Sequence, residues 1–224
     1  MKDCYEVLCY GDSNTWGCIP RWEESALPSE RYDAETRWPK SAQKILGAGF
    51  HMIGEGLNGR TTVYDRAGAA YKNGLTHLTP CLISHRPLDL VILLLGTNDL
   101  FLEIQPPLAR LGDGIRKLAQ TVTDCPSCGR DGNAPKILII SPAAIKQPLG
   151  RAGRYAEFGG ETGGRLSRAF GDVYEAAALE TGCFFLRGAD FASPSDADGI
   201  HWTAESHLAL GAAVAEKLCG IFGE

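Results

Sequence analysis

The order of apolar and polar positions predicts strands that alternate with helices along the whole chain. Residues 88–95 give the strongest strand signal, an apolar run typical of a strand buried on both faces of a parallel sheet. Four further runs predict strands, at residues 5–10, 50–54, 136–141 and 183–186. Helices are predicted at residues 37–46, 74–85, 108–122 and 166–181, and in the terminal segment that contains Leu210, Val214, Leu218 and Ile221.

This alternation predicts an α/β fold, because strands separated by helices pair in parallel and are covered on both faces. We expect a three-layer αβα sandwich around a five-stranded parallel sheet. The chain has no internal repeat and no linker, so residues 1–224 are expected to form a single domain. Two segments without an apolar period, 18–36 and 142–165, are predicted to be loops.

Composition narrows the class of protein. The 224 residues are 44% apolar and 22% charged, which is ordinary for a globular protein. The net charge of −5 does not favour nucleic acid as a partner, and no apolar run is long enough to span a membrane. Residues 1–6 lack the apolar stretch of a signal peptide, so a cytoplasmic location is expected.

Eight cysteines are present, and without a secretion signal we expect them to be reduced thiols. Cys125 and Cys128 form a Cys-x-x-Cys motif. A zinc site would need a second pair, and the chain spaces none for it. We interpret the two residues as thiols in a loop, with a redox pair as the alternative.

The candidate chemistry begins at Ser13, which follows the first strand where it breaks at Gly11. A hydroxyl there lies at the carboxyl edge of the sheet, where α/β proteins build their sites, although Gly-Asp-Ser is also a common turn. Asp198 precedes His201 by three residues, so its carboxylate can hold one imidazole nitrogen while the other accepts a proton from a serine. The alternative is a surface turn with an incidental histidine, and His207 is expected to be solvated. His51, His77 and His85 are likewise expected to be solvated.

Two other strand ends carry residues that could stabilise an oxyanion. The Asn98 side chain could donate to developing negative charge, or it could simply be a turn residue, and Asp99 is expected to stabilise that turn. Gly59 ends a Gly-x-Gly-x-x-Gly motif, but no helix opens there, so dinucleotide binding is not predicted. Its bare backbone N–H could instead approach a ligand closely. Neither a Gly-x-Ser-x-Gly nucleophile elbow nor a His-Glu-x-x-His zinc motif is present.

These motifs fall in one order, at residues 10–17, 37–39, 55–62, 88–99 and 198–201. In this combination the sequence resembles the SGNH (GDSL-type) hydrolase family over nearly its whole length, close to a branch of bacterial arylesterases and a mycobacterial acyltransferase. The resemblance implies a flavodoxin-like fold, with Ser13 as nucleophile, His201 as base and Asp198 as the residue that orients His201. It also implies an oxyanion hole formed by the backbone N–H groups of Ser13 and Gly59 and by the Asn98 side chain.

We therefore expect a serine esterase that hydrolyses small carboxylic esters, with short acyl, aryl or acetyl groups, through an acyl-enzyme. No cofactor and no metal is expected. One alternative is an acyltransferase or perhydrolase that passes the acyl group to an alcohol or a peroxide. The other is a non-catalytic carbohydrate- or ester-binding module on the same fold.

Two expectations concern the surroundings of the site. The substrate pocket is expected to be small and to include Asn14, Trp16, Thr97 and Ile200, with Trp16 and Ile200 as core residues the alternative. Asn14 stands where the relatives often carry leucine, which leaves the acyl preference open. Because relatives of this type form symmetric oligomers, we also expect a homo-oligomer in which residues 142–165, with Tyr155 and Phe158, lie at a subunit contact near the site. The alternative for this segment is a flexible surface loop.

Overall fold

The computed structural model describes residues 4–23, 28–150 and 154–223. A five-stranded sheet lies at its centre, in the order β2-β1-β3-β4-β5, and every neighbouring pair of strands is parallel. The strands are β1 (Tyr5–Gly11), β2 (Phe50–Gly56), β3 (Leu90–Leu94), β4 (Lys136–Ser141) and β5 (Phe184–Arg187). This is the flavodoxin-like strand order, so the predicted fold class is confirmed.

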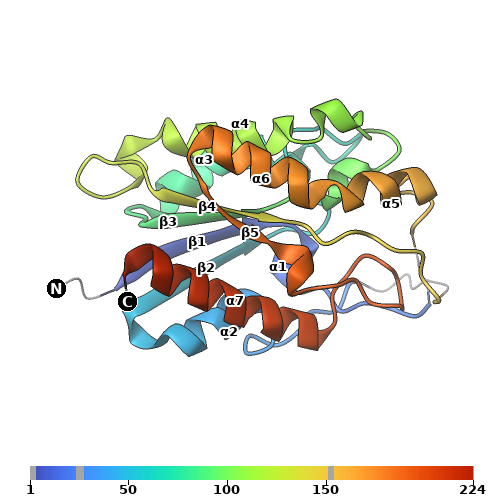
Figure 1. Ribbon diagram of the computed structural model, residues 1–224, viewed down its shortest axis with the longest axis horizontal. Helices are drawn as coiled ribbons and strands as arrows, with labels where there is room; N and C mark the ends of the chain where they lie inside the picture. The colour runs from blue at the N-terminus through green and yellow to red at the C-terminus, as the bar shows by residue number, and fades with distance from the viewer. Residues whose placement is uncertain (1–3, 24–27, 151–153, 224) are drawn as a thin grey trace.

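Helices cover both faces of the sheet (Figure 1). One layer holds α3 (Gly74–His85), α4 (Asp113–Thr123) and α6 (Phe170–Thr181), and the other holds α2 (Trp38–Leu46) and α7 (Ala204–Phe222). Side chains of β1 alternate between the two resulting cores. Leu8 and Tyr10 belong to one buried cluster, whereas Val7 and Cys9 belong to the other. Burial on both faces explains why the strands appear in the sequence as apolar runs.

The helix predicted at residues 108–122 begins later in the structure. Leu108 lies in a separate 3₁₀ turn, Leu108–Arg110, with 53% of its surface exposed, and α4 starts only at Asp113. The spacing from Leu108 to the next apolar residues therefore does not mark the buried face of a helix. The predicted helix at 166–181 is divided, because α5 (Gly160–Arg168) ends before α6 begins at Phe170.

Helix α5 occupies the end of a segment that was predicted to be a loop. Its glycines give it low intrinsic helix propensity, so tertiary packing decides its conformation. A Cβ on Gly163 would lie 1.7 Å from the carbonyl oxygen of Phe158, which means that only glycine permits this close approach. The described part of residues 18–36 forms the predicted loop. Residues 1–3, 24–27 and 151–153, which belong to segments discussed above, lie outside the described residues.

The cysteine prediction is wrong for one pair. Cys125 and Cys128 form a disulfide, with their Cα atoms 5.3 Å apart, because the 3₁₀ turn Pro126–Cys128 brings them within disulfide reach. Free thiols are found at Cys9, Cys18, Cys81, Cys183 and Cys219. Among the described helices, none combines the length and the apolar character that crossing a bilayer requires.

Candidate active site

Ser13 lies at a sharp turn where β1 passes into the one-turn helix α1 (Ser13–Trp16). Gly11 is needed at this turn, since a Cβ there would lie 2.0 Å from the Thr15 hydroxyl and 2.9 Å from the carbonyl oxygen of Leu94. The Asp12 carboxylate caps α1 by accepting a hydrogen bond from the Asn14 N–H at 2.9 Å. The turn therefore holds the Ser13 side chain at the carboxyl edge of the sheet.

A chain of hydrogen bonds joins Ser13 to residues close to the other end of the sequence. His201 Nε2 lies 3.1 Å from Ser13 Oγ, and His201 Nδ1 lies 2.7 Å from Asp198 Oδ2. The other oxygen, Asp198 Oδ1, accepts the backbone N–H groups of Ile200 and His201 at 3.0 and 2.9 Å. The three residues predicted to act together are thus in contact, in the geometry of a nucleophile, a base and an orienting acid.

Asn14 links the two loops that carry these groups. Its Oδ1 accepts the Trp202 N–H at 3.2 Å, and its Nδ2 donates to the carbonyl oxygen of Ile200 at 3.4 Å. Asn14 is buried and does not line the cavity at the site, so its predicted place in the substrate pocket is wrong. Its side chain instead makes hydrogen bonds to the backbone on either side of His201, which an apolar side chain could not make.

Contacts around His201 shift the ionisation of both partners. Burial lowers the pKa of His201, but its hydrogen bond with Asp198 and its contact with the Cys18 thiol outweigh burial, so the pKa is raised above the usual histidine value. For Asp198, burial raises the pKa, while the hydrogen bonds from His201 and from the backbone outweigh it and hold the pKa below its usual range. Asp198 is therefore ionised at neutral pH.

Three potential hydrogen-bond donors face the same space as the Ser13 hydroxyl. Ser13, Gly59 and Asn98 all line one cavity, and Gly59 adopts φ of 78°, which favours glycine. Among the described residues, the backbone N–H groups of Ser13 and Gly59 have no acceptor within the protein. Asn98 Nδ2 donates to the carbonyl oxygen of Arg60 at 3.0 Å and to Asp12 Oδ2 at 3.4 Å. Two backbone donors without an acceptor and one carboxamide therefore belong to residues that line the same cavity.

The buried charged residues Asp12, Arg60 and Asp99 support this arrangement, and only Asp99 was named from the sequence, as a residue that stabilises its turn. Asp99 accepts the Thr62 N–H at 2.8 Å and the Thr62 hydroxyl at 2.6 Å, which ties the loop after β3 to the loop after β2. Burial raises the pKa of Asp12 to about 6 and that of Asp99 to about 7. Arg60 donates to the carbonyl oxygen of Gly11 at 2.9 Å. The sequence offered one clue to their place at the site, namely their position. Asp12, Arg60 and Asp99 each stand next to a residue that the sequence analysis assigned to the site.

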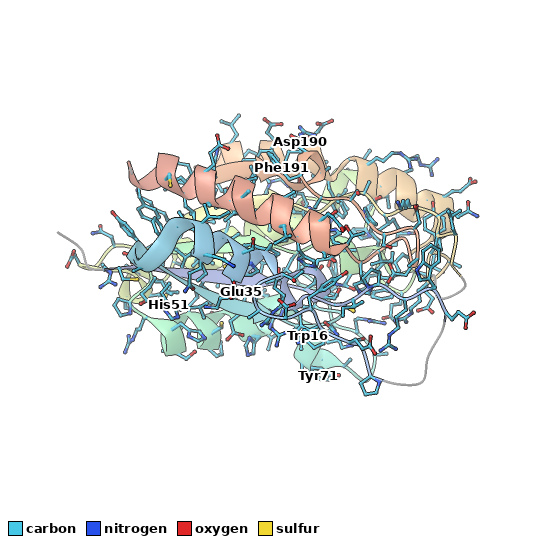
Figure 2. All side chains as sticks on the ribbon, turned by 90° about the horizontal axis from the view of Figure 1, so that it is seen from below. Trp16, Glu35, His51, Tyr71, Asp190 and Phe191 are labelled. Atoms are coloured by element: carbon cyan, nitrogen blue, oxygen red, sulfur yellow. A yellow bond between two sulfur atoms is a disulfide. The ribbon has the colours of Figure 1, made fainter. Side chains whose placement is uncertain are left out.

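The cavity beside Ser13 has a volume of about 240 Å³. Of the four predicted pocket residues, only Ile200 lines it. The Trp16 ring, labelled in Figure 2, packs against Arg31, whose guanidinium carbon lies 4.9 Å from the ring centroid. Thr97 is buried in the turn Thr97–Leu100. A large residue next to a catalytic motif therefore need not line the pocket, because the sequence does not show in which direction its side chain points.

Seven further described residues line the cavity, and none of them was assigned to the substrate pocket from the sequence. They are Ser29, Asn58, Arg66, Lys72, Phe101, Arg154 and Phe158. Phe158 is buried and packs on Phe101 with ring centroids 4.2 Å apart, so it belongs to the core of its own chain and is not free for a subunit contact. The oligomeric state itself stays a prediction.

Of the other histidines, His51 and His77 are exposed, as expected, and His85 is half-buried, whereas His207 differs from its prediction. His207 is fully buried against Tyr32 and Trp202, and burial lowers its pKa to about 4, assisted by the nearby charges of His201 and Arg37. The prediction that His207 is solvated is wrong, because α7 turns this position toward the loops rather than toward water.

Among the described residues, one group of side chains could hold a metal ion. Glu55, Cys81 and His85 have potential ligand atoms within 4.8 Å of one another, although Glu55 and His85 already share a hydrogen bond at 2.9 Å. His51 similarly pairs with Glu6 at 2.7 Å. None of these residues lines the cavity beside Ser13.

Comparison with known proteins identifies the family. The model of the GDSL-like Lipase/Acylhydrolase family matches residues 9–209, which is most of the chain. The chain belongs to this family. Its members are ester hydrolases, and the chain is a carboxylic ester hydrolase of the GDSL type, as the motifs predicted. None of the curated proteins gives a significant match.

Solved structures support the assignment of this GDSL-family esterase. The carbohydrate acetylesterase Est24 from Sinorhizobium meliloti is 38% identical, with a TM-score of 0.89 over 97% of this chain and 99% of that one. The M. smegmatis aryl esterase is 32% identical, with a TM-score of 0.88 over the same shares of the two chains. A lipase/acylhydrolase from Enterococcus faecalis, at 16% identity and a TM-score of 0.64, shares the fold.

Proposed function

We propose that this GDSL-family esterase hydrolyses small carboxylic esters through an acyl-enzyme on Ser13. The observation that carries the proposal is the continuous hydrogen-bonded chain from Ser13 Oγ through His201 to Asp198, with distances of 3.1 and 2.7 Å. These three residues line a cavity that Gly59 and Asn98 also line. Residues 1–224 would provide the whole site as one domain.

In the first half-reaction, His201 Nε2 takes the proton of Ser13 as Oγ attacks the ester carbonyl carbon. Negative charge then develops on the carbonyl oxygen, and the N–H groups of Ser13 and Gly59 donate to it. Asn98 adds the Nδ2 hydrogen that otherwise points to Asp12 Oδ2 at 3.4 Å, while its other hydrogen stays on the Arg60 carbonyl oxygen. His201 returns the proton to the leaving alcohol as the ester bond breaks. Asp198 keeps the imidazole in the required tautomer and stabilises the imidazolium.

In the second half-reaction, water replaces the alcohol. His201 takes a proton from water as its oxygen attacks the acyl carbon, and a second tetrahedral intermediate uses the same donors. The bond to Ser13 Oγ then breaks, Oγ regains a proton from His201, and the carboxylic acid leaves. Each proton taken is returned, so the protein ends the cycle in its starting state.

The substrate is proposed to carry a short acyl group. The cavity of about 240 Å³ is below the usual range for drug-sized ligands, and Ile200 narrows it beside His201. Two similar proteins are named as a carbohydrate acetylesterase and an aryl esterase, which supports acetyl esters of sugars or phenols as the first substrates to test.

Steady-state hydrolysis of p-nitrophenyl acetate tests the proposal. Ser13→Ala should lower kcat by about 10⁴-fold or more while the circular dichroism spectrum is unchanged. Ser84→Ala, at an exposed serine of α3, is the matched control and should retain wild-type kcat. Wild-type turnover by Ser13→Ala would remove Ser13 as the nucleophile.

A further inference from the structure

The cavity beside Ser13 is lined by cationic side chains that ester hydrolysis does not require. Arg66, Lys72 and Arg154 all contribute to its wall. Asp198 is the one acidic residue among the described residues of this wall, and it is already hydrogen-bonded to His201. A neutral ester would bring no charge of opposite sign to these three cations.

Lys72 lies beside Gly59, one of the proposed oxyanion donors. Its Nζ lies 2.9 Å from the point where a Cβ on Gly59 would be, so the ammonium group rests against the glycine that faces the oxyanion. The Lys72 backbone is fixed, since its carbonyl oxygen accepts the Thr61 N–H at 3.0 Å. In the described part of the chain no carboxylate pairs with Lys72, whereas the neighbouring Tyr71 points outward with 66% exposure (Figure 2).

The two arginines extend the positive surface over Phe101. The Arg66 guanidinium carbon lies 3.8 Å from the centroid of the Phe101 ring, and that of Arg154 lies 5.7 Å from it. Each arginine has an acidic partner, Glu103 at 2.7 Å for Arg66 and Glu157 for Arg154, but neither glutamate lines the cavity. Apart from Asp198, which is hydrogen-bonded to His201, the charged side chains that line the cavity are therefore cationic.

The ionisation of Lys72 is consistent with a positive potential in the cavity. Burial lowers its pKa first, and the charges of Arg66 and Arg154 lower it further. Repulsion among three cations raises the free energy of the empty site, and an anion among them would relieve it.

We propose that Lys72, with Arg66 and Arg154, forms an anion-binding subsite, and that the substrate of this esterase carries an anionic group such as a carboxylate. This inference rests on the proposed function, because the subsite is defined relative to Ser13. The anion belongs either to the acyl group or to the alcohol of the ester. Lys72 is a specificity-determining residue in this account, not a group that takes part in proton transfer.

Two pairs of esters that differ in charge test the inference. The acyl arm compares mono-p-nitrophenyl succinate with its methyl ester, and the alcohol arm compares meta-acetoxybenzoate with meta-acetoxybenzamide. The quantity measured is the ratio of kcat/KM for the anionic ester to kcat/KM for the neutral one, after correction for spontaneous hydrolysis. Lys72→Gln should lower this ratio about tenfold in at least one arm, which corresponds to about 1.4 kcal/mol.

The controls separate local recognition from net charge. Lys72→Arg should restore most of the ratio, and Lys117→Gln, which removes an exposed charge on α4, should leave it at the wild-type value. Salt should lower kcat/KM more for the preferred anionic ester, since the screening length falls from about 30 Å at 0.01 M to about 3 Å at 1 M.

Three results would overturn the inference. An unchanged ratio in both arms would exclude the subsite while leaving the esterase intact. An equal fall in kcat for charged and neutral esters would assign Lys72 to stabilisation of the oxyanion instead. Failure of the unmodified protein to hydrolyse any of the four esters would contradict the proposed function, and the subsite with it.

Discussion

Replacement of Asn98 by alanine tests the oxyanion hole. The Asn98 Nδ2 group is buried and donates to the Arg60 carbonyl oxygen at 3.0 Å, which fixes the carboxamide before substrate arrives. Loss of one such donor typically lowers kcat by about 10²–10³, or about 2.7–4 kcal/mol of transition-state stabilisation. Because the donor acts on charge that develops only during reaction, KM should change little.

The same substitution has a calculable structural cost. It leaves the Arg60 carbonyl oxygen and Asp12 Oδ2 without this donor, and an unsatisfied buried polar group costs about 1–3 kcal/mol. Unfolding in urea should therefore show a modest loss of stability beside the loss of kcat.

The assay is steady-state hydrolysis of p-nitrophenyl acetate, with kcat and KM resolved separately. Thr97→Ser is the control, because Thr97 lies in the same turn but does not line the cavity. A kcat for Asn98→Ala within twofold of the wild-type value would refute the assignment of Asn98 to the oxyanion hole.

Three further predictions concern pH, acyl length and assembly. Only neutral His201 can accept the proton, and its pKa is raised, so kcat/KM should increase with pH through a limb above about 6.5; a limb clearly below that value would contradict the assignment. Ile200→Ala should extend hydrolysis toward hexanoyl esters, whereas Trp16→Ala should not, because Ile200 lines the cavity and Trp16 does not. The measurement is the ratio of kcat/KM for a hexanoyl ester to kcat/KM for an acetyl ester. The protein should be an oligomer, and a light-scattering mass of 24.1 kDa at micromolar concentration would show a monomer instead.

The sequence was sufficient for the sheet and for the reacting groups, for identifiable physical reasons. Strands buried on both faces leave apolar runs, as in β3, and a glycine that ends a strand marks the place where a short side chain can reach the sheet edge. The Asp198–His201 spacing allows one turn of backbone to fold the carboxylate onto the ring. These signals are local, so a reader of the sequence can find them.

The pocket walls could not be predicted because they depend on long-range packing. The Thr61 N–H bonds the Lys72 carbonyl oxygen and so holds Lys72 near Gly59, and Phe158 packs on Phe101 from the segment that precedes α5. Trp16 and Thr97 are close to site residues in sequence but point elsewhere. Proximity along the chain thus predicts the turn that a residue occupies, not the cavity that its side chain lines.

Trapping the covalent intermediate tests the central claim most directly. The protein would be treated with a fluorophosphonate, digested, and mapped by mass spectrometry, with Ser13→Ala and Ser84→Ala treated in parallel. The account predicts one stoichiometric adduct on the peptide that contains Ser13, its absence in Ser13→Ala and its full retention in Ser84→Ala. An adduct on another residue, or labelling of Ser13→Ala at the wild-type rate, would contradict it.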